Sequence, residues 1–282
     1  MMKHKIGNRE LHPIGVGTWG MGGDRFDDGN LFADYRDDER EIEAIRYAVA
    51  LGQNHIDTAQ LYGAGHTEEI VGEAIAGLDR ESLFIATKVW RSHSLRNAVP
   101  HAATESLRKL RLDVIDLLYV HAPWDAIPMA EYIGGLNDAV DAGLTKMIGV
   151  SNFTTVQLEE AIGLSKHPIV ANQVHYSLLK RETVDDRMRT LCEKHDVTIV
   201  AYRPVERKAL TDTTAPTTVL DAAEKLGCTP AQLAIAWLIG QPGVVTIPKA
   251  SSPTHVDENF AATTVHIPDD MRERLDAVIG ST

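Results

Sequence analysis

Three residues near the ends of apolar segments, together with a nearby tyrosine, have side chains that can jointly reduce a carbonyl group. Asp57 and Tyr62 lie five residues apart, Lys88 ends the apolar run 83–88, and His121 ends the run 115–121. Carbonyl reduction needs a hydride on carbon and a proton on oxygen. A phenol has an unperturbed pKa of about 10, and an adjacent ammonium lowers that value toward the working pH. The pattern therefore predicts Tyr62 as the proton donor and Lys88 as the group that makes it more acidic.

Asp57 and His121 complete the predicted chemistry. A buried lysine needs a carboxylate partner, and Asp57 is available for that role. His121 either orients the carbonyl oxygen or relays a proton. Each of these residues taken alone also fits an ordinary packing or capping role. Their joint placement after successive apolar segments is what favours catalysis.

The elements that must position these residues alternate regularly along the chain. Short apolar or β-branched runs predict eight buried parallel strands, and amphipathic stretches predict helices between them. The strands are expected at 14–17, 54–57, 83–88, 115–121, 147–150, 169–173, 198–202 and 244–248, with helices including 39–51, 68–76, 98–110, 156–164 and 229–239. A hairpin that turns at Gly7-Asn8 precedes them, and a further helix-like stretch, 269–279, follows. This order predicts one (β/α)8 TIM-barrel domain over residues 1–282, with an N-terminal β-hairpin and an extra C-terminal helix.

A doubly wound open sheet is the competing architecture, and length alone does not separate the two. The polar residues at the strand ends favour the barrel, because a barrel directs every one of them into the same mouth. They are Asp57, Lys88, His121, Ser151 with Asn152, Gln173, Tyr202 and Lys249.

The segment Gly15-Val16-Gly17-Thr18-Trp19-Gly20 satisfies the G-x-G-x-x-G dinucleotide fingerprint. That motif requires a helix to begin directly after it, so that the helix N-terminus holds a pyrophosphate. The residues that follow have little helix potential. We therefore interpret these glycines as allowing a tight turn at the barrel mouth, with Trp19 leaning over it. The acidic stretch 24–39 is expected to be a solvated surface rather than a flap.

Composition excludes several classes of partner. The net charge of −12 disfavours nucleic acid and anionic membranes. No apolar run reaches the ~18 residues of a membrane helix, and no signal peptide is recognisable. Cys192 and Cys228 lack metal-site spacing and are expected to be ordinary thiols of a reducing compartment. These features predict a soluble cytoplasmic protein without a metal.

In its motifs and their order the chain resembles the aldo-keto reductase superfamily. The resemblance extends from Gly17-Thr18-Trp19 through Ile247-Pro248-Lys249 to Glu258-Asn259. It implies an NADPH-dependent reductase of aldehydes or ketones whose catalytic tetrad is Asp57, Tyr62, Lys88 and His121.

The resemblance also implies a set of cofactor-binding residues. Ser151, Asn152 and Gln173 match residues that hold the nicotinamide carboxamide, and Tyr202 matches the ring that stacks on the nicotinamide. Lys249 matches a contact to the 2′-phosphate, whereas Glu258 and Asn259 match groups near the adenine. Ser151-Asn152 as a helix cap and Tyr202 as a packing residue are the structural alternatives.

The chain departs from the family pattern where NADPH is recognised. A serine usually follows the lysine and an arginine lies six residues after it, but here these positions are Ala250 and His255. A neutral imidazole binds a phosphate weakly, so NADH use becomes possible, and Ser251 is a candidate to compensate. Arg207 and Lys208 are further positively charged residues. They either contact the pyrophosphate of the cofactor or form a cluster on the solvated surface.

Short loops around the predicted mouth indicate an open site with broad substrate selectivity. Trp19, Trp90 and Trp124 are the candidates for an aromatic pocket wall. Two other functional classes remain: a cofactor-sensing regulatory protein on the same barrel, and a barrel metal hydrolase with His121 and Asp57 as ligands. The second lacks another suitably spaced histidine, and Lys88 would repel a metal. The physiological substrate, reaction direction and oligomeric state do not follow from the sequence.

Overall fold

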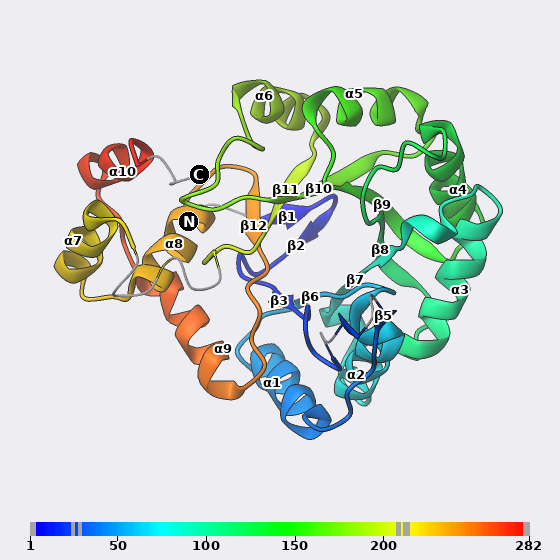
Figure 1. Cartoon of the computed structure of the whole chain (residues 1–282), viewed down its shortest axis with the longest axis horizontal. Helices are drawn as coiled ribbons and strands as arrows, with labels where there is room; N and C mark the ends of the chain where they lie inside the picture. Colours follow the sequence, from blue (N-terminus) through cyan, green and yellow to red (C-terminus); the bar gives the residue numbers. More distant parts are fainter. Residues whose placement is uncertain (1–3, 24–25, 28–29, 207–209, 211–214, 279–282) are drawn as a thin grey trace.

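The fold is an eight-stranded parallel sheet closed into a barrel inside a ring of helices, as seen in a computed structural model (Figure 1). The structure describes residues 4–23, 26–27, 30–206, 210 and 215–278. Strand order follows the chain, and two bridges, Ile14 to Thr246 and Gly17 to Lys249, join the first strand to the last. The predicted (β/α)8 barrel is confirmed and the open-sheet alternative is wrong.

The sheet strands are β3 (Val16–Gly17), β6 (His55–Asp57), β7 (Phe84–Val89), β8 (Ile115–Val120), β9 (Thr145–Ser151), β10 (Ile169–His175), β11 (Thr198–Tyr202) and β12 (Val244–Thr246). The helices are α1 (Asp38–Ala50), α2 (His66–Ile75), α3 (Ala98–Leu110), α4 (Met129–Asp141), α5 (Thr155–Leu164), α6 (Asp186–His195), α7 (Thr217–Leu226), α8 (Pro230–Ile239), α9 (Pro253–Phe260) and α10 (Asp269–Asp276), with 3₁₀ turns η1 (Tyr62–Gly65), η2 (Arg80–Ser82), η3 (Arg91–His93) and η4 (Ala261–Thr264). Among the described residues, no helix is long and apolar enough to cross a bilayer.

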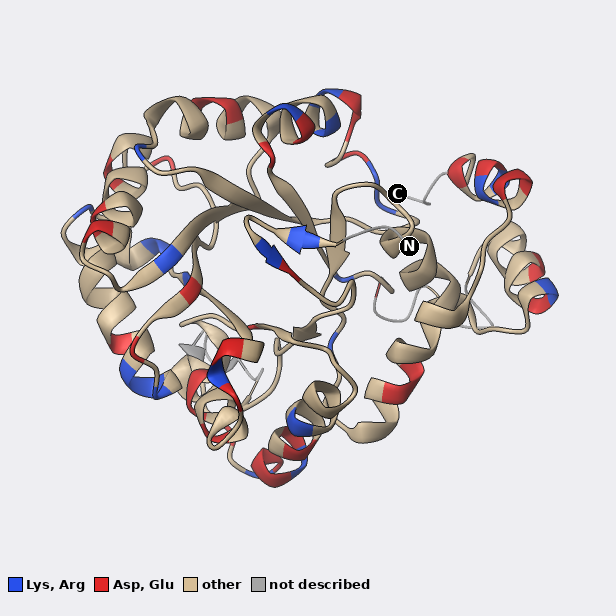
Figure 2. Ribbon diagram, turned by 180° about the vertical axis from the view of Figure 1, so that it is seen from behind, with Lys and Arg blue, Asp and Glu red and all other residues tan. Residues whose placement is uncertain are grey.

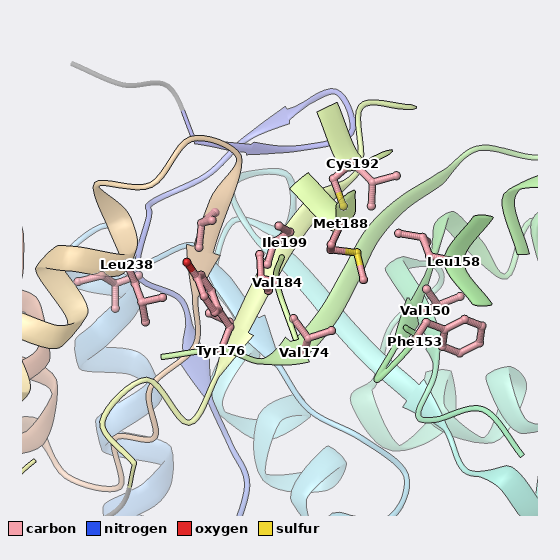
Figure 3. Packing of buried hydrophobic residues seen from close by; sticks show 14 of the residues in the cluster. Val150, Phe153, Leu158, Val174, Tyr176, Val184, Met188, Cys192, Ile199 and Leu238 are labelled. Atoms are coloured by element: carbon pink, nitrogen blue, oxygen red, sulfur yellow. The ribbon is translucent and has the colours of Figure 1, made fainter. Parts of the chain in front are cut away.

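The strands are mostly apolar because both of their faces are covered. Every residue of β7 and β8 is buried. Outward-facing strand residues pack against the helices, and Figure 3 shows this layer, where Met188 and Cys192 of α6 lie beside Val174 and Ile199 of the sheet. Figure 2 shows that Lys, Arg, Asp and Glu residues are located mainly on the surrounding helices.

The predicted N-terminal hairpin closes one end of the barrel. Its strands are β1 (Lys5–Ile6) and β2 (Arg9–Glu10), which pair antiparallel and lie across the centre of the ring in Figures 1 and 2. Ile6 and Leu11 pack against inward-facing residues of the barrel such as Phe84. This hairpin plugs the N-terminal end of the strands and leaves the opposite end open for a site.

The acidic stretch after β3 contains more structure than a solvated loop. Two short strands, β4 (Phe26–Asp27) and β5 (Asn30–Leu31), pair antiparallel there. No helix follows the glycine motif in the described residues before α1, which agrees with setting the dinucleotide fingerprint aside.

The barrel seam depends on Gly17, which has no room for a side chain. A Cβ at this position would lie 2.4 Å from the Ile247 carbonyl oxygen. We expect Gly17→Ala to lower the free energy of unfolding by about 1–3 kcal/mol, measured by urea denaturation. Gly163→Ala is the control, because nothing lies within 4 Å of its Cβ in α5; it should stabilise by about 0.5–1 kcal/mol. Equal stability of the two variants would mean that the seam tolerates the extra methyl group.

Candidate active site

The four predicted catalytic residues converge at the open end of the barrel. Asp57 is the last residue of β6, Lys88 is the penultimate residue of β7, and His121 follows β8. Tyr62 opens the 3₁₀ turn η1, in which Gly63 has a φ of 53° and a Cβ would lie 2.5 Å from the Gly22 carbonyl oxygen. This left-handed turn returns the chain toward the barrel and buries the Tyr62 ring.

Lys88 is the centre of the hydrogen-bond network. Its fully buried Nζ donates to Asp57 Oδ1 at 2.5 Å, to the Thr58 carbonyl oxygen at 2.9 Å and to Tyr62 Oη at 3.2 Å. The second carboxylate oxygen, Asp57 Oδ2, accepts a hydrogen bond from Gln173 Nε2 at 2.7 Å. The ammonium thus has three acceptors, one of which is the phenol, and each oxygen of the Asp57 carboxylate accepts one hydrogen bond.

Aromatic rings surround the phenol. Tyr62 makes edge-to-face contacts with Trp19, at 5.0 Å between ring centroids, and with His121, at 5.6 Å. Trp90 in turn contacts His121 at 5.1 Å. Two of the three predicted pocket tryptophans therefore lie beside the tetrad. Trp124 packs against the hydrophobic core instead, with no ring contact to the tetrad among the described residues.

The electrostatics of the site differ in one respect from the sequence expectation. Burial raises the pKa of Tyr62, and the Lys88 ammonium offsets only part of that rise, so the expectation of a lowered phenol pKa is wrong. Burial alone would lower the pKa of Lys88, but Asp57 and Tyr62 outweigh it and raise that pKa. Both groups therefore remain protonated at neutral pH.

His121 is an uncharged imidazole at neutral pH. Burial, followed by the charges of Lys88 and Arg91, lowers its pKa to about 3. Its Nδ1 is buried without a hydrogen-bond partner in the described residues. A neutral ring of this kind can donate one hydrogen bond to a carbonyl oxygen. Between the two roles predicted for His121, these properties favour orientation over proton relay.

A second buried histidine, His55, predicts acid sensitivity of the fold. Both of its ring nitrogens lack partners in the described residues, and burial lowers its pKa to about 4. The unfolded chain, with a pKa near 6.5, binds the proton more readily, so stability is complete above about pH 6.5 and falls by about 3 kcal/mol as the pH drops to about 4.

Urea denaturation at pH 7 and pH 4.5 measures this effect. His55→Leu should be at least as stable as wild type at pH 7, because no hydrogen bond is lost, and should lose less stability on acidification. An unchanged pH dependence in this variant would show that His55 is not its source.

The predicted carboxamide-binding residues form one hydrogen-bonded group beside the tetrad. Asn152, whose φ is 63°, donates from Nδ2 to the His121 carbonyl oxygen at 3.0 Å and accepts from Tyr202 Oη at 2.8 Å. Ser151 Oγ donates to the Gln173 carbonyl oxygen at 2.9 Å. The ends of β9, β10 and β11 therefore bring together the Asn152 amide, the Ser151 hydroxyl and the Tyr202 ring.

The predicted adenine and 2′-phosphate residues lie together after β12. Lys249 pairs with Gly17 across the seam, and its Nζ donates to the Gly20 carbonyl oxygen at 3.3 Å. Asn259 Nδ2 donates to the Lys249 carbonyl oxygen at 3.2 Å. The remaining members, His255 and Glu258, lie on α9, and Ser251 lies just before that helix. Arg207 and Lys208 are outside the described residues.

The geometry of a buried Lys-Asp pair, a phenol and a neutral histidine at a barrel mouth agrees with the family resemblance. The sequence profile of the Aldo/keto reductase family matches residues 13–279. The chain belongs to the aldo/keto reductase family. Membership confirms the predicted oxidoreductase class.

Relatives of this aldo/keto reductase include enzymes named for carbonyl reduction. Methylglyoxal reductase DkgB of Salmonella typhi is 34% identical over 238 residues, covering 82% of this chain and 84% of that protein. Methylglyoxal reductase YeaE of Escherichia coli K12 is 31% identical over 265 residues, covering 93% and 88%.

Solved structures of aldo/keto reductases also match closely. The thermostable aldo-keto reductase Tm1743, solved with the inhibitor epalrestat, has a TM-score of 0.91 and 39% identity, covering 98% of this chain and 99% of that one. An aldo/keto reductase of Klebsiella pneumoniae, solved with NADP and acetate, has a TM-score of 0.85 and 32% identity, covering 97% and 94%.

Two residues of the same mouth were not predicted. His175 ends β10 and stacks on Tyr202, and Glu206 hydrogen-bonds to His175. Alternation along β10 places His175 on the same face as Gln173, which was a usable signal. No sequence signal places Glu206, because it depends on a left-handed turn made by residues other than glycine.

Proposed function

We propose that this aldo/keto reductase transfers a hydride from NADPH to aldehydes and ketones, with Tyr62 as the proton donor. The observation that carries the proposal is the hydrogen bond between Lys88 Nζ and Tyr62 Oη, in a site whose ammonium is held by Asp57. Carbonyl reduction is the chemistry of the family, and the methylglyoxal reductases among the relatives support a small carbonyl compound as substrate.

The residues at the mouth fit a nicotinamide dinucleotide. Tyr202 offers a partly exposed ring, and Asn152 supplies both a donor and an acceptor. Lys249 has no carboxylate within ion-pairing distance among the described residues, which suits a phosphate partner. The Klebsiella relatives solved with NADP and NADPH support this cofactor. When bound, the cofactor supplies the hydride.

The chain's own residues then control the proton and the carbonyl group. Tyr62 donates its phenolic proton to the carbonyl oxygen. Lys88 remains charged and stabilises the phenolate that results, and Asp57 keeps the ammonium in place. Neutral His121 donates a hydrogen bond that orients the oxygen. Trp19 and Trp90 line the apolar side of the site, where they limit access of water.

Titration with NADPH and NADH, followed by tryptophan fluorescence, tests the proposal when it is combined with turnover of a nitrobenzaldehyde and methylglyoxal. A reductase binds cofactor and consumes it with either carbonyl compound. A regulatory sensor on the same barrel binds cofactor without appreciable turnover, and that result would refute the catalytic proposal. Failure to bind either cofactor would refute the cofactor assignment as well.

Position 255 is expected to set the choice between NADPH and NADH. His255 lies in the first turn of α9, six residues after Lys249 in the sequence, but offers no permanent charge. We expect His255→Arg to tighten NADPH binding by about fivefold to tenfold and to leave NADH binding unchanged, because guanidinium binds phosphate through paired hydrogen bonds. Equal gains for both cofactors would show that the side chain does not contact the 2′-phosphate.

A further inference from the structure

The ring of Tyr202 is held by Asn152 and His175, and the guanidinium carbon of Arg203 lies 6.0 Å from the ring centroid. Its hydroxyl donates to Asn152 Oδ1 at 2.8 Å, and one face is covered by the imidazole of His175. The two rings lie 5.3 Å apart between centroids and are inclined by 20°. Their stacking follows from the sheet register, which pairs His175 with Tyr202 on adjacent parallel strands about 4.8 Å apart.

The imidazole of His175 is itself held by a hydrogen bond to Glu206. His175 Nε2 lies 2.7 Å from Glu206 Oε1, and the same oxygen accepts a hydrogen bond from buried Ser177 Oγ at 2.6 Å. Arg203 and Glu206 have φ angles of 53° and 47°, a left-handed conformation that residues other than glycine adopt at a cost. This turn returns the Glu206 carboxylate to the end of β10.

Hydrogen-bond chemistry defines the state of His175. A carboxylate only accepts hydrogen bonds, so Nε2 carries the proton in the contact with Glu206. Burial lowers the pKa of His175, with Glu206 opposing and Arg203 and Lys180 adding to the effect. The ring is therefore neutral at pH 7 and stacks on Tyr202 as an uncharged aromatic group.

We propose that His175 is a positioning residue for the cofactor: it supports one face of Tyr202 so that the nicotinamide stacks on the other, and Glu206 holds it there. The inference rests on the proposed function, because it presumes that Tyr202 receives the nicotinamide. It predicts that His175 affects cofactor binding and hydride transfer without contacting the carbonyl substrate.

The test separates the ring from its anchor. His175→Ala removes the imidazole ring and its hydrogen bond to Glu206. His175→Phe keeps an aromatic ring against Tyr202 but lacks that hydrogen bond. Glu206→Asn removes the carboxylate that accepts the hydrogen bond, and asparagine tolerates the positive φ at this position. The matched control is His167→Ala. His167 precedes the other end of β10, and its Nε2 lies 2.8 Å from a carboxylate oxygen of Asp141. Each protein is assayed for NADPH dissociation constant by fluorescence, for kcat and KM with nitrobenzaldehyde, and for a cooperative thermal transition.

The expected result for His175→Ala is an NADPH dissociation constant raised about three- to tenfold, with a lower kcat and an unchanged KM for the carbonyl substrate. His175→Phe should recover most of the cofactor affinity, Glu206→Asn should be intermediate, and His167→Ala should match wild type. Wild-type values for His175→Ala, or no recovery in His175→Phe, would overturn the inference while the reductase assignment stands. Wild-type protein that neither binds nor oxidises NADPH would overturn the proposed function and the inference together.

Discussion

Tyr62→Phe is expected to bind NADPH with wild-type affinity and to lose about a hundredfold to ten-thousandfold in kcat. The loss is the usual contribution of a positioned general acid, and the phenylalanine side chain has no proton to donate. The substitution removes one oxygen from a buried ring whose packing against Trp19 and His121 is otherwise kept. Steady-state reduction of nitrobenzaldehyde and fluorescence titration with NADPH measure the two quantities separately.

The matched control for this change is Tyr119→Phe. Tyr119 is a fully buried tyrosine of the barrel interior whose hydroxyl makes no hydrogen bond to the catalytic tetrad in the described residues, although the Asp57 carboxylate adds to burial in raising its pKa. Loss of its hydroxyl should change kcat far less than loss of the Tyr62 hydroxyl. Full activity in Tyr62→Phe would mean that another group or a water molecule protonates the product, and the assignment of the acid would be wrong.

Lys88→Met is expected to destabilise the fold as well as stop catalysis. It removes the partner of a buried carboxylate, and an uncompensated buried charge costs about 3–5 kcal/mol. Asp57→Asn should show a similar cost, since it leaves the ammonium without a counter-charge. Urea denaturation at pH 7 provides the free energies of unfolding.

The double variant Asp57→Asn/Lys88→Met separates stability from function. It buries no unpaired charge and should be more stable than either single variant, although it should remain inactive because the phenol has lost its ammonium. Additive losses in the double variant would contradict the strong coupling that the structure indicates between these two side chains.

The sequence was sufficient for the barrel because its strands are covered on both sides. Runs such as Phe84–Val89 and Ile115–Val120 have no exposed face, so they are mostly apolar, with Thr87 and Lys88 near the end of the first and Asp116 near the start of the second. The same rule located the tetrad, since parallel strands of a barrel deliver their last residues to one mouth.

Properties that depend on packing distance were not predictable. The pKa of Tyr62 is a balance between burial and the Lys88 charge, and residue types alone do not determine which is larger. The hydrogen bond from Gln173 to Asp57 joins residues 116 positions apart. The β4–β5 strands have only two residues each, too few to show alternation, although the Asp28-Gly29 pair in the sequence was a usable hairpin signal. Glu206 reaches His175 through a turn that has no glycine signature.

The barrel can close only after its last strand has been synthesised, because the first and last strands pair with each other. Two backbone bridges, Ile14 to Thr246 and Gly17 to Lys249, join segments that lie more than four-fifths of the chain apart in sequence. During synthesis the sheet formed by the first seven strands therefore keeps both of its edges unpaired until the last strand leaves the ribosome. The Lys249 ammonium arrives with that strand, so the phosphate-binding end of the proposed cofactor site can be completed only when the ring itself closes.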